Sequence, residues 1–126
     1  MRCLIFLVLA IAAGAAPASA SSYVACDNGL RCFAAPCPST NVLDVRALIV
    51  RQGIYLALDR LSPADRNKVE QANASYNGAL VLKGDIKNRT ITAMGKQHKL
   101  PHLVATAIER QSTATERHLC RSAKPK

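Results

Sequence analysis

The chain has 126 residues, of which 17 are Lys or Arg and 8 are Asp or Glu, so its net charge is +9. This length suits one domain with a modest core. The basic balance favours anionic partners and argues against a strongly basic one.

The first 20 residues have the pattern of a secretory signal peptide. Arg2 precedes an apolar run over residues 3–13, and small residues at Ala18 and Ala20 mark a cleavage site. The run is shorter than the roughly 20 residues that a membrane-spanning helix needs. We therefore predict a signal peptide at residues 1–20 and one exported domain at residues 21–126, periplasmic or secreted, without a transmembrane segment.

The predicted domain keeps four of the five cysteines, at Cys26, Cys32, Cys37 and Cys120. An even number of cysteines in an exported domain predicts two disulfides, for which three pairings are possible. We favour Cys32–Cys37 as a local bridge, because prolines flank Cys37 and stiffen the loop, and Cys26–Cys120 as a long one. Zinc is disfavoured, because the C-x5-C and C-x4-C spacings depart from the usual pairs of ligands.

The first half of the domain reads as strands separated by turns. A short strand at residues 23–25 is followed by a loop rich in cysteine and proline up to residue 41. Residues 42–50 alternate between apolar and polar at their start, and residues 54–58 form a second apolar segment. Because residues 51–53 resemble a turn, we expect these two segments to pair as a hairpin.

The next segment carries clear signals for the start of a helix. Ser62 can cap the first turn, Pro63 suits the first helical position, and Asp65 places a negative charge at the positive end of the helix dipole. We expect the helix to run to about Ser75 and to end before Asn77-Gly78. The expected buried stripe consists of Val69, Ala72 and Tyr76.

The last part of the chain is predicted to return to strands. Residues 79–82 form a buried strand, and residues 87–89 turn the chain back into a strand at residues 90–94. Residues 103–109 could be helix or strand, and their β-branched residues favour strand. Residues 110–118 could form a short helix that returns the last cysteine to the N-terminal region.

This order of elements predicts a mainly β or α+β fold. The arrangement fits a small antiparallel sheet, or a barrel like that of oligonucleotide/oligosaccharide-binding domains, with one helix between strands and disulfides as staples. Nucleic acid is disfavoured as a partner, because export removes the protein from it and Tyr55 and Tyr76 are expected in the core.

No pattern of residues predicts catalysis. The sequence has no G-x-S-x-G turn and no glycine-rich phosphate loop, and its cysteines are expected in disulfides. His98 and His102 lie four residues apart, but Pro101 would break a helix between them, so we expect an exposed loop. We therefore expect no catalytic residue, no cofactor and no metal site.

Several segments resemble a family of uncharacterised small exported bacterial domains. The resemblance rests on the loop from Cys32 to Pro38 and on the segments at residues 54–61, 80–84 and 103–106. It implies an envelope or secreted protein and carries no activity or catalytic residue with it. Cys26 and Cys120 lie outside these segments.

The charge pattern predicts a weak anion-binding site near the second predicted hairpin, formed by Lys83, Lys87, Arg89, Lys96 and Lys99. A smaller basic tail covers residues 121–126. We therefore expect a non-catalytic exported protein that binds an anionic envelope lipid or polymer. The alternatives are an inhibitor or immunity protein against a partner with an acidic surface and, favoured least, a small hydrolase. The sequence leaves the oligomeric state open.

Overall fold

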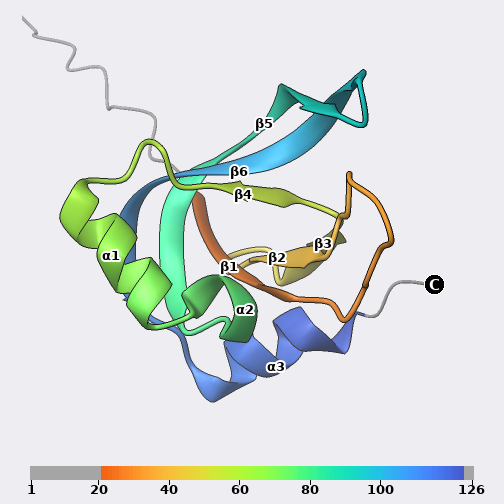
Figure 1. The fold of residues 1–126 in the computed structure, drawn as a ribbon. Helices are drawn as coiled ribbons and strands as arrows, with labels where there is room; N and C mark the ends of the chain where they lie inside the picture. Colours follow the sequence, from red (N-terminus) through yellow and green to blue (C-terminus); the bar gives the residue numbers. More distant parts are fainter. Residues whose placement is uncertain (1–20, 124–126) are drawn as a thin grey trace, which may run out of the picture.

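A computed structural model describes residues 21–123, so the predicted signal peptide and the end of the basic tail lie outside the described residues. These residues form a curled six-stranded sheet flanked by helices (Figure 1). The strands are β1 (Ser21–Asp27), β2 (Thr40–Asp44), β3 (Ile49–Gln52), β4 (Tyr55–Ala57), β5 (Leu80–Ala93) and β6 (Lys96–Gln111). The helices are α1 (Pro63–Gln71), α2 (Ala74–Asn77) and α3 (Ala114–Ser122). The prediction of a small α+β domain stapled by disulfides is confirmed.

The strands lie in the order β3-β2-β1-β5-β6-β4. All neighbours are antiparallel except β4 and β6, which are parallel, so the sheet is mixed. α1 and α2 connect β4 to β5, which places helical structure between strands as predicted. No helix within residues 21–123 is long and apolar enough to cross a membrane.

The predicted hairpin between residues 42–50 and 54–58 is wrong in its pairing. A turn at residues 45–48 divides the first segment into β2 and β3, which pair with each other. The Asp44 carboxylate stabilises this turn by accepting hydrogen bonds from the amides of Arg46 and Ala47. β4 is a strand as expected, but it pairs with β6 at the edge of the sheet opposite β3. No local turn signal could indicate this pairing.

The start of α1 is as predicted, and its end is not. The Ser62 side chain accepts a hydrogen bond from the Asp65 amide, and Pro63 occupies the first turn. The helix stops at Gln71, because Asn73 adopts a left-handed conformation before the short α2 begins. Val69 is buried as expected, whereas Ala72 is exposed.

Tyr76 also lies outside the core. It is 53% exposed on α2, because the break before that helix rotates it away from the predicted stripe. Gly78, with φ at +72°, ends α2 as the sequence indicated.

The predicted turn at residues 87–89 does not exist. β5 continues through it as one strand of 14 residues, and β6 pairs with it over 16 residues. The chain reverses at Met94 and Gly95, both of which have positive φ, as two-residue hairpin turns require. The segment at residues 103–109 is strand, and the predicted C-terminal helix is α3.

The core is divided between the two faces of the sheet because side chains alternate along each strand. On β1, Tyr23 and Ala25 face one cluster, whereas Val24 and Cys26 face another beneath α3. A third cluster, under α1 and α2, includes Leu61, Val69, Ala74, Leu82 and Ala105. Each helix therefore covers part of the apolar surface of the sheet.

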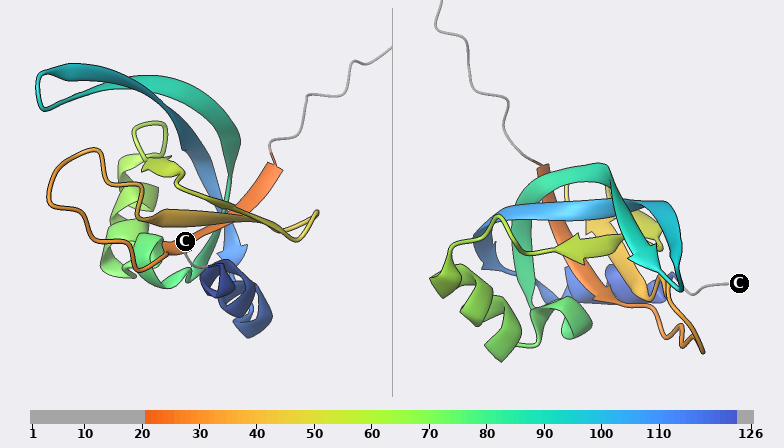
Figure 2. Two further views of the ribbon diagram at one scale, coloured as in Figure 1. Left: turned by 90° about the vertical axis from the view of Figure 1, so that its right-hand side faces the viewer. Right: turned by 45° about the horizontal axis from the view of Figure 1, so that its top comes forward.

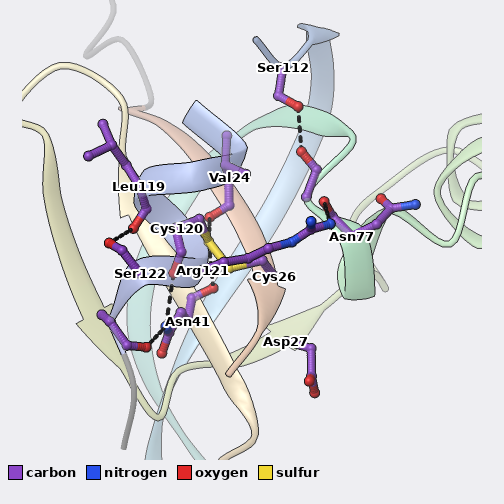
Figure 3. The surroundings of a disulfide bond; sticks show 12 residues. Val24, Cys26, Asp27, Asn41, Asn77, Ser112, Leu119, Cys120, Arg121 and Ser122 are labelled. Atoms are coloured by element: carbon purple, nitrogen blue, oxygen red, sulfur yellow. Dashed lines mark hydrogen bonds between the residues drawn. A yellow bond between two sulfur atoms is a disulfide. The ribbon is translucent and has the colours of Figure 1, made fainter. Parts of the chain in front are cut away.

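Both favoured disulfides are present, Cys26–Cys120 and Cys32–Cys37. Cys26–Cys120 joins β1 to α3 across a sequence separation of 94 residues. Around it, the Asn41 side-chain amide donates to the carbonyls of Cys120 and Ala123 at 2.9 and 2.6 Å (Figure 3). These bonds satisfy carbonyl groups at the C-terminal end of α3, where no helical partner is available.

The other end of α3 is held by a capping box and an ion pair. Thr113 and Glu116 exchange side-chain to backbone hydrogen bonds, and both carboxylate oxygens of Glu116 accept from Arg110 at 2.8 Å. The hydrogen bonds from Arg110 lower the pKa of the buried Glu116 carboxyl to about 2. This pair therefore ties α3 to the end of β6.

Removing the long disulfide should destabilise the domain strongly. In the chain-entropy model, a bridge that closes this loop contributes about 4–5 kcal/mol, and one that closes a six-residue loop contributes about 2 kcal/mol. The double variant Cys26→Ser/Cys120→Ser should therefore unfold at much lower denaturant concentration than wild type. Cys32→Ser/Cys37→Ser is the matched control, and an equal loss of stability in the two variants would contradict this assignment.

The Glu116→Gln variant should be less stable than wild type by about 1–2 kcal/mol at neutral pH, a value discounted because Arg110 is partly solvated. Since folding lowers the pKa from 4.5 to about 2, this difference should be complete above pH 4.5 and vanish as the pH falls toward 2. Denaturant unfolding at several pH values measures it. Glu70→Gln, on the exposed face of α1, should show no such pH dependence.

Candidate anion-binding face

The long hairpin of β5 and β6 carries an unusual charge pattern. Residues 86–108, which we call the basic ribbon, contain two basic residues before the turn, two lysines after it, and not one Asp or Glu. Its far half extends beyond the other strands (Figure 2). The basic side chains are Lys87, Arg89, Lys96 and Lys99. The positive charge is therefore concentrated on a projecting part of the molecule.

The ribbon distributes these side chains over both of its faces. Lys87 and Arg89 share one face of β5, and Lys96 faces the same side because it pairs with Ala93. Lys99 pairs with Thr90 and therefore faces the opposite side. The structure thus brings three of the five predicted bases to one face.

Lys83 is separated from the other predicted bases. A register shift follows it in β5, at Lys83/Gly84, and Lys87 lies four strand residues further on, or about 13 Å. Lys83 is exposed near the core of the sheet, outside the projecting half of the hairpin. Lys83 therefore adds to the positive charge of the surface, but it lies outside the basic ribbon.

Arg60 is a basic residue that the sequence analysis missed. It lines a hollow of about 290 Å³ with Lys87 and Arg89, at the base of the ribbon. Asp85 adds a negative charge to the same hollow. Arg60 lies in this hollow because it follows β4, which pairs with β6. The sequence could have indicated this position of Arg60 only if the parallel pairing had been known.

Arg89 already has a carboxylate partner within the fold. It donates to the two oxygens of Asp59 at 2.8 and 3.5 Å, and this hydrogen bonding lowers the pKa of the exposed Asp59 carboxyl. Arg60 also approaches Asp59, at 3.8 Å. Asp59 therefore offsets part of the positive charge of the hollow, and Lys87 is an exposed base there for which no carboxylate partner is described within residues 21–123.

The two histidines of the predicted loop lie in β6, so the expectation of an exposed loop is wrong. His102 is buried and stacks on Tyr55 with ring centroids 5.3 Å apart, and its Nδ1 lies 2.9 Å from the Leu100 carbonyl oxygen. His98 is about 13 Å away at strand spacing, too far to share a metal ion with it. Within residues 21–123, no three His, Cys, Asp or Glu side chains gather as metal ligands.

Comparison of the chain with family models, with curated proteins and with solved structures found no match. The resemblance to uncharacterised exported bacterial domains therefore stays a prediction.

Proposed function

We propose that this protein is a non-catalytic exported binding protein whose basic ribbon recognises an anionic component of the cell envelope. The observation that carries the proposal is the run of residues 86–108, which places exposed lysines on a projecting hairpin and includes no acidic residue. The predicted signal peptide and the two disulfides support an oxidising, exported setting.

The layout of the charges supports an extended ligand over a small one. Lys87 and Lys96 face one side of the ribbon and Lys99 faces the other, so a small anion could not contact all three at once. A polymer or a charged surface presents many phosphate or carboxylate groups and can meet each base separately. Such binding between solvated charges weakens as salt is added.

Neutralising the ribbon should reduce this binding. We expect the triple variant Lys87→Gln/Lys96→Gln/Lys99→Gln to bind heparin, used as a soluble polyanion probe, about tenfold or more weakly than wild type at low salt, because three charge contacts are lost. Salt titration on a heparin column, with affinity measured by calorimetry, checks both the loss and its salt dependence.

A second triple variant controls for net charge alone. Arg46→Gln/Arg51→Gln/Lys68→Gln removes the same number of exposed positive charges from the β2–β3 hairpin and α1. It should bind heparin nearly as well as wild type. Equal losses in the two variants would mean that total charge decides the binding, and the ribbon would lose its assigned role.

Asp59 offers a test in the opposite direction. Asp59→Asn removes the negative charge beside the hollow and releases the guanidinium of Arg89. We expect heparin affinity at low salt to rise by about two- to fivefold, because the local potential becomes more positive. Asp65→Asn, at the start of α1, is the matched control and should leave the affinity near the wild-type value. Unchanged or weaker binding by Asp59→Asn would contradict the involvement of the hollow.

A further inference from the structure

Two large apolar side chains project into solvent close to the basic ribbon. Phe33 is fully exposed in the loop between β1 and β2, and Met94 is 76% exposed at the turn between β5 and β6. Single exposed apolar residues are common on protein surfaces. These two differ because the loops that carry them share one side of the molecule (Figures 1 and 2).

The loop that carries Phe33 is held in place by several constraints. The Cys32–Cys37 disulfide closes it, and the buried Asn28 binds its far end through hydrogen bonds to Ser39 and Pro38 at 2.9 and 3.0 Å. A loop that is already constrained loses less backbone conformational entropy when it binds. The backbone that carries Phe33 is therefore already ordered before binding.

The turn that carries Met94 also favours exposure. Met94 has φ at +52°, in the left-handed region where Asn is the common residue in two-residue hairpin turns. Methionine does not favour this backbone conformation as Asn does, and the Met94 side chain is not packed in the core. Lys96 follows two residues later, so the apolar tip of the ribbon is joined directly to its basic part.

The two loops lie on the same side of the domain. The loop at residues 28–39 and the β5–β6 turn come near each other in all three ribbon views (Figures 1 and 2). Tyr55 lies at the base of the ribbon, where its ring stacks on His102 of β6. One flat surface could therefore meet both tips.

We propose that this side of the molecule docks on an anionic phospholipid bilayer, with Phe33 and Met94 entering the interfacial region and Lys96 and Lys99 meeting the lipid phosphates. The proposal rests on the proposed function and names the ligand as lipid. Interfacial binding combines buried apolar area with attraction between basic side chains and anionic headgroups. The ribbon and the neighbouring loop supply both.

The separation of the two tips favours a membrane over a protein pocket. Protein interfaces place their anchors in a continuous, desolvated core. Here, Phe33 and Met94 stand on different loops, with basic residues on the ribbon behind the Met94 tip. A bilayer accepts isolated apolar side chains at separate points, because its interface is fluid and uniform.

The test uses the protein with both disulfides formed and vesicles of phosphatidylcholine with or without phosphatidylglycerol. Wild type should cosediment with the anionic vesicles and not with the neutral ones. Phe33→Ser/Met94→Asn should weaken vesicle binding about tenfold or more, because two apolar side chains no longer insert. Asn keeps the turn conformation at residue 94.

The matched control is Leu48→Asn/Ile49→Ser on the β2–β3 hairpin. Leu48 also has positive φ, both residues are more than half exposed, and this hairpin points away from the ribbon (Figure 2). The control should bind anionic vesicles as wild type does. Equal losses in the two double variants would overturn the assignment of the docking side.

Heparin binding separates this inference from the proposed function. Vesicle binding that falls in Phe33→Ser/Met94→Asn while heparin binding stays unchanged supports the docking proposal. Heparin binding without vesicle binding, or vesicle binding insensitive to the double variant, overturns the lipid assignment and leaves the anion-binding function standing. If wild type binds neither heparin nor anionic vesicles, both the anion-binding function and the docking proposal are overturned. A stoichiometric protein partner that survives high salt and depends on Phe33 would instead indicate an inhibitor or immunity protein.

Discussion

The fold depends on the covalent link between β1 and α3. Cys26 lies in the middle of the sheet and Cys120 near the end of the chain, and both are fully buried. Because the bridge fixes α3 against β1, it also limits where β6 can end before the chain turns into α3. Asn41 and Glu116 then hold the two ends of the helix, so the bridge, the cap and the ion pair act on one short element.

The same arrangement leaves the β5–β6 hairpin longer than the sheet that supports it. β1 pairs with β5 only up to Gly84, and β4 contributes just three residues beside β6. Beyond them, β5 and β6 pair only with each other within residues 21–123. Stacking of Tyr55 on His102 and the ion pair of Asp59 with Arg89 support the ribbon at its base. Arg89 therefore has a structural partner, and the proposed contacts with an anionic ligand fall to the lysines.

Local chemistry explains which elements could be predicted. Ser62 and Pro63 mark the start of α1 because capping acts within one turn, and Gly78 ends α2 because glycine adopts positive φ without strain. The turn expected at residues 87–89 fails for the opposite reason. Its residues suit a turn locally, but continuous pairing with residues 100–102 of β6 keeps them extended. Among the candidate bases, spacing alone could not show that Lys99 faces away from Lys87.

The sequence by itself determined the excess of positive charge, the cap of α1 and, through cysteine count and spacing, the preferred disulfides. These properties depend on composition or on residues close together in the chain. Only the tertiary structure decided the parallel pairing of β4 with β6, the place of Arg60 in the hollow, and the common side of the loop at residues 28–39 and the β5–β6 turn (Figure 2). Each of these brings together segments whose contact depends on the packing of the whole sheet, which no local pattern encodes.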